Sequence, residues 1–336
     1  MTESPLLTYI VPVYNTEPYV LRCLLSILDQ GLEDGEYEVI VVDDGSTDGS
    51  RELIEAFAKE HPQVRLMAQK NAGVSAARNR AIAGARGRYL QFVDSDDHLQ
   101  PGQMASLLRQ AIDEGLDVLV FNYECEDEQG NKLPASRNDN FEASPVTDGV
   151  TYLKGHSMTP YIWRFLINRE YLNGGGWRFN ESLIVCEDGE LITHLLLNAR
   201  RMVQSDAALY HYVQRGNSAM NNRNVEHLHR RIMSQVESAS LIDKTIKRHE
   251  AATGQQAPAS VAGLRNVYLY FALTKALTCG FVKPTVERMR QSGLYPFPCV
   301  GPEANYYGRK WKLIHVLMMR PGLWNLLSWV YRTIKG

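Results

Sequence analysis

The sequence predicts an α/β fold in which a mostly parallel sheet carries helices on both faces, followed by a C-terminal helical region. In the first 122 residues, short β-rich segments alternate with segments whose apolar residues recur at helical spacing. Strands and helices that alternate in this way favour right-handed crossovers and a parallel sheet. From residue 226 onward the apolar periodicity is helical, which predicts a helical region at 223–336.

The expected elements follow one another closely along the chain. The expected strands are Leu7–Val13, Glu38–Val42, Val64–Ala68, Tyr89–Val93 and Asp117–Asn122. The expected helices between them are one from Val20 to near Gln30-Gly31, Ser50–Glu60, Val74–Ala85 and Pro101–Glu114. The polar, acidic stretch 124–150 predicts a solvated loop, and 161–167 predicts a further strand. Two helices are expected between residue 226 and Lys283-Pro284, and Pro321 is expected to divide the last segment into two short helices.

Composition limits the classes of function. A net charge of −2 gives no general attraction to nucleic acid. The five cysteines are widely spaced and form no Cys-x-x-Cys pair, which argues against a disulfide framework and against a zinc site. The N-terminus carries no basic segment followed by a long apolar stretch, and no apolar run is long enough to span a bilayer. We therefore expect a cytoplasmic protein.

Polar side chains follow the carboxyl end of each of the first four expected strands. These are Tyr14-Asn15, Asp43-Asp44, Asn71 and the run Asp94-Ser95-Asp96-Asp97. Open α/β sheets bind ligands at this edge. Asp94 and Asp96 are two positions apart, so in an extended chain they point the same way, and a hard divalent cation would offset their repulsion. The alternative is a solvated turn in which Ser95 or Asp97 caps the following helix.

Four motifs occur in an order that resembles a known family. They are Val11-Pro12-Val13-Tyr14-Asn15, the stretch from Val42 to Asp48, the stretch from Asn71 to Asn79, and Asp94-Ser95-Asp96-Asp97. Together they resemble the signature of family 2 glycosyltransferases with the GT-A fold, of the type that builds bacterial surface polysaccharides. The resemblance is dense over residues 6–125 and thinner to about residue 220.

The resemblance implies a catalytic domain at 1–222, with a nucleotide-binding half at 1–125 and an acceptor half at 126–222. It implies inverting transfer of a sugar from a nucleoside-diphosphate sugar, with a UDP-sugar expected, to a glycan or a lipid-linked glycan. It also implies Mn²⁺ or Mg²⁺ as cofactor, held by Asp94 and Asp96. Two alternatives are a nucleotidyltransferase and a non-catalytic sugar-nucleotide binding module. The first needs a glycine-rich loop after the first strand, which is missing.

Carried over by position, the resemblance assigns a nucleotide-binding role to thirteen residues. They are Pro12, Tyr14, Asn15, Asp43, Asp44, Asn71, Arg78, Asp94, Ser95, Asp96, His211, Arg215 and Ser218. Asp43 is expected to accept a hydrogen bond from the uracil imide, and Asp94 to contact the ribose. For Tyr14 a place at the edge of the core is an equal alternative. For Asp43 the alternative is a hydrogen bond within its own turn, for Arg78 a solvated helix position, and for His211 a structural hydrogen bond.

Glu187-Asp188 precedes an amphipathic segment and is similar to the Glu-Asp pair that the family places beneath the acceptor. The resemblance implies that Asp188 is the general base and that Glu187 orients the acceptor. The alternative is that both carboxylates only complement the positive end of a helix dipole.

The last segment, 309–335, interleaves tryptophan and leucine with six basic residues, and no acidic residue follows Glu303. Such a pattern predicts peripheral contact with an anionic membrane, here the inner face of the plasma membrane. The alternative is that its apolar faces pack on the catalytic domain.

Overall fold

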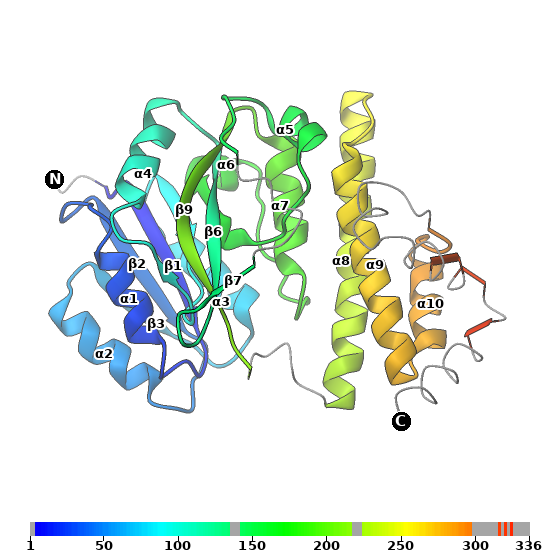
Figure 1. The fold of residues 1–336 in the computed structure, drawn as a ribbon, viewed down its shortest axis with the longest axis horizontal. Coiled ribbons are helices and arrows are strands. Elements are labelled where there is room, and N and C mark those ends of the chain that lie inside the picture. Colours follow the sequence, from blue (N-terminus) through cyan, green and yellow to red (C-terminus); the bar gives the residue numbers. More distant parts are fainter. Residues whose placement is uncertain are drawn as a thin grey trace. The chain divides into compact units, whose positions relative to one another are not determined.

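The computed structural model describes residues 4–134, 142–216 and 224–297, with 315–316, 319–320 and 323–324. The chain divides into two units (Figure 1), each described here by itself. Unit 1 is Met1–Gly149, Tyr161–Glu181 and Asn198–Gly216, and unit 2 is Val150–Pro160, Ser182–Leu197 and Asn217–Gly336. This grouping differs from the boundary expected near residue 222, because residues 150–160 and 182–197 join the C-terminal helices.

Unit 1 contains a parallel half-sheet built on β1 (Leu7–Val13). β1 pairs in parallel with β2 (Tyr37–Asp43) and with β4 (Tyr89–Phe92), and β2 pairs in parallel with β3 (Val64–Ala68). Every residue of β1, β2 and β4 is buried. Burial of this kind follows when both faces of a parallel sheet are covered, and it explains the continuous apolar runs in the sequence.

Alternate residues of these strands pack on opposite faces. Val11 and Val39 belong to one core cluster with side chains of α1 (Val20–Leu28), α2 (Ser50–Glu60) and α4 (Met104–Asp113). On the other side α3 (Val74–Gly84) packs against β1 and β2. The predicted fold class is therefore confirmed, with helices on both faces of the sheet.

The second half of the sheet is mixed. The strand order is β3-β2-β1-β4-β8-β6-β9-β5, with β7 (Lys132–Leu133) paired to β6. β8 (Phe165–Asn168) runs antiparallel between β4 and β6 (Val118–Asp127). β9 (Met202–Gln214) is parallel to β6, and β5 (His98–Leu99) is antiparallel to β9. A 3₁₀ turn at Ile162–Arg164 precedes β8, and α6 (Arg169–Gly174) follows it.

Three boundaries expected from the sequence are wrong. β6 continues to Asp127, because its acidic positions alternate with Tyr123 and Cys125, which enter the core cluster, and because β9 pairs along it. The helix expected from Pro101 begins at Met104, since Gly102 adopts a positive φ of 71° in a turn. Residues 162–164 form the 3₁₀ turn rather than part of a strand.

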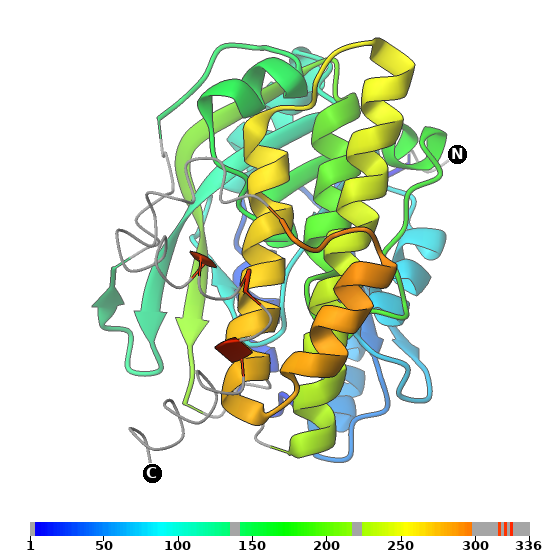
Figure 2. The same ribbon diagram turned by 90° about the vertical axis from the view of Figure 1, so that its right-hand side faces the viewer.

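Unit 2 is helical (Figure 2). It contains α5 (Gly149–Gly155), α7 (Glu187–Asn198), α8 (Val225–Thr253), α9 (Ala259–Cys279) and α10 (Val282–Gln291). α8 and α9 pack side by side, and α10 contacts both. α10 was not expected, because a proline usually ends a helix. Pro284 instead lies in the first turn of α10, where a proline costs no helical hydrogen bond.

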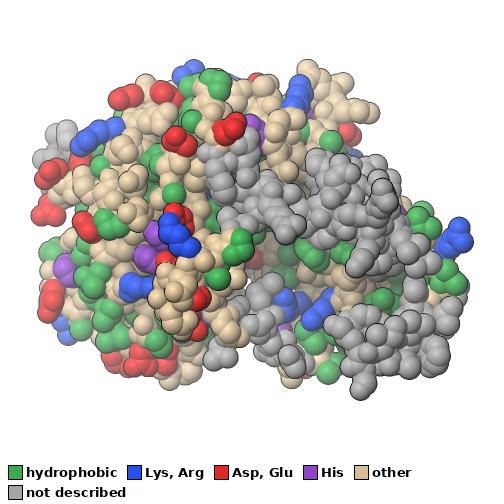
Figure 3. Space-filling view, viewed as in Figure 1, with side chains coloured by type: hydrophobic (Ala, Val, Ile, Leu, Met, Phe, Trp, Pro, Cys, Tyr) green, Lys and Arg blue, Asp and Glu red, His purple; other side chains and the backbone are tan. Residues whose placement is uncertain are grey.

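None of the helices in the described ranges is long and apolar enough to cross a membrane. Acidic and basic side chains are interspersed over the face of unit 1 in Figure 3. Most of the segment 309–335, for which membrane contact is expected, lies outside the described residues.

Candidate functional site

Two carboxylates at the end of β4 each bind an arginine. Arg78 of α3 is buried and donates from Nη2 to Oδ1 of Asp94 at 2.9 Å. Arg215, which directly follows β9, forms an ion pair with Oδ2 of Asp96 and lies over the ring of Tyr19. The side chains of Asp94 and Asp96 are 31% and 24% exposed. The structure thus brings together four of the predicted residues as two partly exposed acid–base pairs.

The donor set fits a hard cation that arrives with a phosphate ligand. The arginines contact one oxygen of each carboxylate, Asp94 Oδ1 and Asp96 Oδ2. Within the described residues the other two oxygens accept no side-chain hydrogen bond and form no ion pair. Mg²⁺ is commonly bound by one or two carboxylates together with substrate phosphates. Asp94 and Asp96 are therefore suitable ligands, and the two arginines are suitable partners for phosphate oxygens.

The residues between and after these carboxylates accept hydrogen bonds from other parts of unit 1. The buried Asp97 accepts hydrogen bonds from the hydroxyl of Tyr210 at 2.7 Å and from the amide of Val213 at 2.8 Å. Ser95 is buried and accepts from the hydroxyl of Thr16 at 3.0 Å. α4 has no side-chain cap, so the alternative in which Ser95 or Asp97 caps that helix is wrong.

Asp43 and Asp44 organise the turn after β2. Asp43 is fully buried, and its oxygens accept from the amide of Ser46 at 3.0 Å and from Nε of Arg51 at 2.8 Å. Burial alone would raise the pKa of Asp43, but the hydrogen bonds of Ser46 and Arg51 outweigh it and hold that pKa below its ordinary value. The contact of Asp43 with a uracil imide remains a prediction.

The carboxylate of Asp44 holds the loop that leads into α3. It accepts from Gln69 Nε2 at 2.8 Å and from the amides of Ala72 and Gly73 at 2.9 and 2.8 Å. The exposed Asn71 lies in this loop. Gly45 has a φ of 77°, and a Cβ there would lie 2.8 Å from the amide nitrogen of Asn71. The turn after β2 and the loop before α3 are therefore closely packed.

The end of β1 lies beside the same turn. Pro12 is buried within β1 opposite Val42, and Tyr14 is 49% exposed. Asn15 has a φ of 53° and accepts a hydrogen bond from the amide of Thr47 at 2.7 Å. The exposure of Tyr14 favours the nucleobase reading over a place in the core, although that contact also remains a prediction.

Glu187 and Asp188 begin α7 in unit 2, and both are half-buried. The turn before them is held by α8, since Ser234 accepts from the amide of Ile184 at 3.0 Å and Ser238 donates to the carbonyl of Cys186 at 2.8 Å. Cys186 has a φ of 64°, which is strained for a residue with a side chain.

Gly189, one residue after Asp188, is closely packed against α9. A Cβ at Gly189 would collide with the hydroxyl of Tyr268. The first turn of α7 is therefore held in a fixed, strained position, which is a common feature of functional sites.

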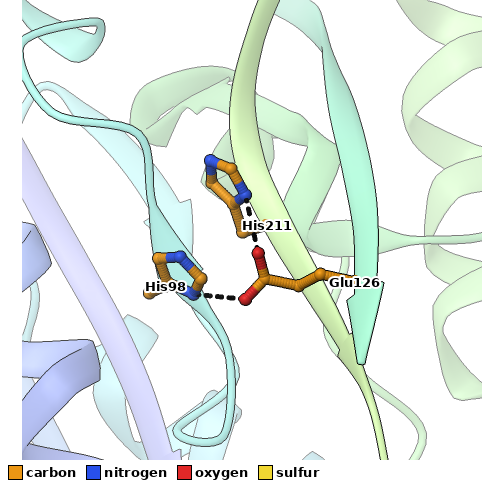
Figure 4. A group of neighbouring side chains, drawn as sticks. All are labelled: His98, Glu126 and His211. Atoms are coloured by element: carbon orange, nitrogen blue, oxygen red, sulfur yellow. Dashed lines mark ion pairs between the residues drawn. The ribbon is translucent and has the colours of Figure 1, made fainter. Parts of the chain in front are cut away.

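His211 lies next to His98 and Glu126, neither of which was predicted as a site residue. Its Nδ1 lies 3.4 Å from Oε2 of Glu126, and Nδ1 of His98 lies 3.6 Å from Oε1 of the same carboxylate (Figure 4). Burial, together with the charges of Arg22 and His211, lowers the pKa of His98 to about 4. The feature of the sequence that could have identified Glu126 is its place in an alternating pattern with Tyr123 and Cys125. Ser218 lies outside the described residues.

Comparison with known proteins identifies the family. A model described as "Glycosyl transferase family 2" matches residues 8–175, which is half of the chain. Glycosyltransferase EpsJ of Bacillus subtilis (strain 168) is 33% identical over 217 residues, 64% of this chain and 62% of EpsJ. A hyaluronan synthase of Pasteurella multocida is 31% identical over 202 residues, 58% of this chain and 19% of the synthase. The chain thus spans only part of the length of both relatives.

The fold is also that of a solved structure. The crystal structure of S. aureus TarS 1–349 in complex with UDP-GlcNAc matches with a TM-score of 0.57 at 22% sequence identity, covering 88% of this chain and 94% of that one. The family-model match and the shared fold agree with the four ordered motifs, and the chain belongs to glycosyl transferase family 2.

Proposed function

We propose that the chain is an inverting, metal-dependent glycosyltransferase that moves a sugar from a UDP-sugar to a glycan or lipid-linked glycan. The observation that carries the proposal is the pairing of Asp94 with Arg78 and of Asp96 with Arg215 at the end of β4. Mg²⁺ on a diphosphate is usually bound by one or two carboxylates, and arginines are well suited to bind phosphate oxygens. The UDP-GlcNAc bound to TarS supports a UDP-sugar as donor.

On the nucleotide side, the positions of the predicted residues are compatible with the roles proposed for them. Tyr14 is exposed at the end of β1 and borders the uracil with Pro12, and Asp43 accepts from the uracil imide. Asn15 and Asp44 fix the turns that surround the base, and the exposed Asn71 contacts the nucleotide from the loop before α3.

The diphosphate lies against the carboxylates and their arginines. Asp94 contacts the ribose and, with Asp96, ligates Mn²⁺ or Mg²⁺. When bound, the cation stabilises the charge that develops on the departing diphosphate. When the diphosphate binds, Arg78 and Arg215 each release a carboxylate oxygen and contact phosphate oxygens instead. Ser95 lies in the turn between Asp94 and Asp96, and the family resemblance supports nucleotide contacts for His211 and Ser218.

On the acceptor side, Asp188 takes the proton of the attacking hydroxyl. Inversion by a single displacement requires such a base opposite the leaving group. Neighbouring side chains point in different directions, so Glu187 orients the acceptor instead. The strained turn at Cys186 and the packing of Gly189 support a fixed base rather than a solvated helix end.

The acceptor belongs to surface-polysaccharide assembly in this proposal, which the similarity to a hyaluronan synthase supports. The basic segment 309–335 then brings the chain to the inner face of the plasma membrane, where lipid-linked acceptors are found. Sedimentation with neutral and anionic vesicles tests that part, because binding to both kinds equally at low salt rejects an electrostatic attachment.

Thermal unfolding in the presence of nucleotides tests the proposed donor. UDP-sugars with Mn²⁺ should raise the melting temperature, because a ligand at a hundredfold excess over its Kd stabilises the native state by about 2.7 kcal/mol. ADP with Mn²⁺ is the matched control and should give a smaller shift. Equal shifts with UDP and ADP, or a shift with UDP that does not depend on Mn²⁺, would contradict the proposal.

A further inference from the structure

Strand pairing brings two histidines and a glutamate to one face of the sheet in unit 1. His98 of β5 lies opposite His211 of β9 in the antiparallel pair. Glu124 of β6 is the partner of His211 in the parallel pair, so Glu126 lies two positions further along the same face. Their chain neighbours Leu99, Tyr210 and Cys125 all enter the core cluster on the opposite face.

The three side chains converge on one point (Figure 4). The two imidazole rings are stacked, with centroids 4.5 Å apart and an interplanar angle of 12°. One ligand atom from each of the three residues lies within 4.8 Å of the other two. Both Nδ1 atoms are buried, and neither has a hydrogen-bond partner among the described residues. Two buried nitrogens without hydrogen-bond partners, 3.4 and 3.6 Å from one carboxylate, are costly unless a proton or a cation lies between them and the carboxylate.

Gln100 fixes the orientation of the His211 ring. Its Oε1 lies 2.9 Å from Nε2 of His211. A carbonyl oxygen accepts, so Nε2 of His211 is the donor to Gln100. In the neutral ring the lone pair is then on Nδ1, on the side of Glu126. Histidine ligands of metals characteristically donate their second N–H to such an acceptor, which fixes the tautomer and the ring orientation.

We propose that His98, Glu126 and His211 bind a transition-metal ion, for which Zn²⁺ is the representative species. Two imidazoles and one carboxylate are a common ligand set for Zn²⁺, with water in the fourth position. The site uses no cysteine, so the cysteine spacing that argued against zinc does not apply. Asp94 and Asp96 do not belong to this site, and their carboxylate oxygens suit Mg²⁺ or Mn²⁺.

Binding requires a modest closure of the cluster. Tetrahedral bonds of 2.0–2.1 Å place ligand atoms about 3.4 Å apart, whereas the present atoms are spread over up to 4.8 Å. Arg22 of α1 lies 3.6 Å from Oε1 of Glu126 and is 43% exposed, so it can move into solvent when a cation takes its place. The bound ion would then link β5, β6 and β9.

Calorimetric titration of the full chain with Zn²⁺, after treatment with a chelator and without nucleotide, tests the proposal. The wild type should bind one Zn²⁺ per chain at this site, and His98→Ala, Glu126→Gln and His211→Ala should each lose it. Gln100→Ala should bind about 10- to 100-fold more weakly, the usual effect of removing a partner of a ligand. The double variant Asp94→Asn/Asp96→Asn is the control for the other carboxylates and should bind Zn²⁺ as the wild type does.

The variant Arg22→Met provides a test that does not rely on loss of binding, which misfolding alone could cause. The proposal expects Arg22→Met to bind Zn²⁺ more tightly than the wild type. Circular dichroism of every variant checks the fold. Undiminished Zn²⁺ binding in the three ligand variants would overturn the proposal. Loss of binding in the Asp94→Asn/Asp96→Asn variant alone would overturn it too, since the ion would then occupy the carboxylate site.

Discussion

The hydroxyl of Tyr210 donates a hydrogen bond to the buried carboxylate of Asp97 at 2.7 Å and accepts one from the amide of Asp94 at 3.1 Å. One phenol group on β9 therefore fixes both ends of the Asp94–Asp97 turn. Burial, and then the nearby charge of Asp94, raise the pKa of Asp97. The hydrogen bond from Tyr210 is thus one of the few interactions that stabilise the charged form of Asp97 in the interior.

Tyr210→Phe should lower the free energy of unfolding by about 1–3 kcal/mol, because it leaves buried polar groups of Asp97 and Asp94 without their partner. Tyr212→Phe is the control, since Tyr212 is on the same strand but is 38% exposed. Urea denaturation measures both. An equal, small effect of the two substitutions would show that the Tyr210 hydroxyl contributes nothing specific.

Glu38 makes the stability of unit 1 depend on pH. Its carboxylate accepts from Thr8 Oγ1 at 2.8 Å, from the amide of Arg86 at 2.7 Å and from Nε of Arg86 at 2.9 Å. Burial alone would raise the pKa of Glu38, but the hydrogen bonds from Arg86 and Thr8 hold that pKa below its ordinary value. The resulting stability is present above the pKa of the unfolded state and is lost as pH falls through the folded-state pKa.

Glu38→Gln should therefore be less stable than the wild type near neutral pH, and the difference should shrink as the pH falls below about 4. Glu55→Gln on the exposed face of α2 is the control and should show no such trend. Urea unfolding across this pH range measures both differences. A stability difference for Glu38→Gln that is independent of pH would contradict the predicted linkage.

Asp188→Asn should lower kcat by about 10²- to 10⁴-fold, the usual contribution of a general base, while the affinity for UDP-sugar and Mn²⁺ stays near wild type. Glu190→Gln is a matched control, because it removes a carboxylate from the same first turn of α7 and hence from the same helix dipole. Steady-state rates and donor binding separate the two effects. If both variants lose the same activity, the carboxylates act only through the helix terminus.

Local patterns predicted the first half of unit 1 closely. The bounds of Leu7–Val13, Ser50–Glu60 and Val64–Ala68 agree with the structure, because apolar periodicity and turn residues within each segment determine them. The acidic end of β6 was not predicted. Its strand conformation depends on pairing with β9, about 80 residues later in the chain, and the acidic composition of 124–127 suggested a loop.

The residues of the candidate site were likewise predicted where the local sequence determines them and missed where their contacts join distant segments. Asp94 and Asp96 were found because they directly follow a strand, whereas their partner arginines come from α3 and from the end of β9. Asp43 and Asp44 were predicted for the same reason. Their hydrogen bonds within the turn could not be predicted from the sequence. The grouping of His98, Glu126 and His211 depends on the register of three strands, which no local pattern contains.

The measurement that tests the proposed function most directly is the binding of UDP, with and without Mn²⁺, to the wild type and to Asp96→Asn. Asp206→Asn is the matched control, since Asp206 is an exposed carboxylate on β9. Mn²⁺ should strengthen UDP binding to the wild type and to Asp206→Asn by at least about tenfold, or 1.4 kcal/mol, and should have little effect on Asp96→Asn. Full Mn²⁺ dependence in Asp96→Asn, with the fold intact, would contradict the assignment of the metal to Asp96.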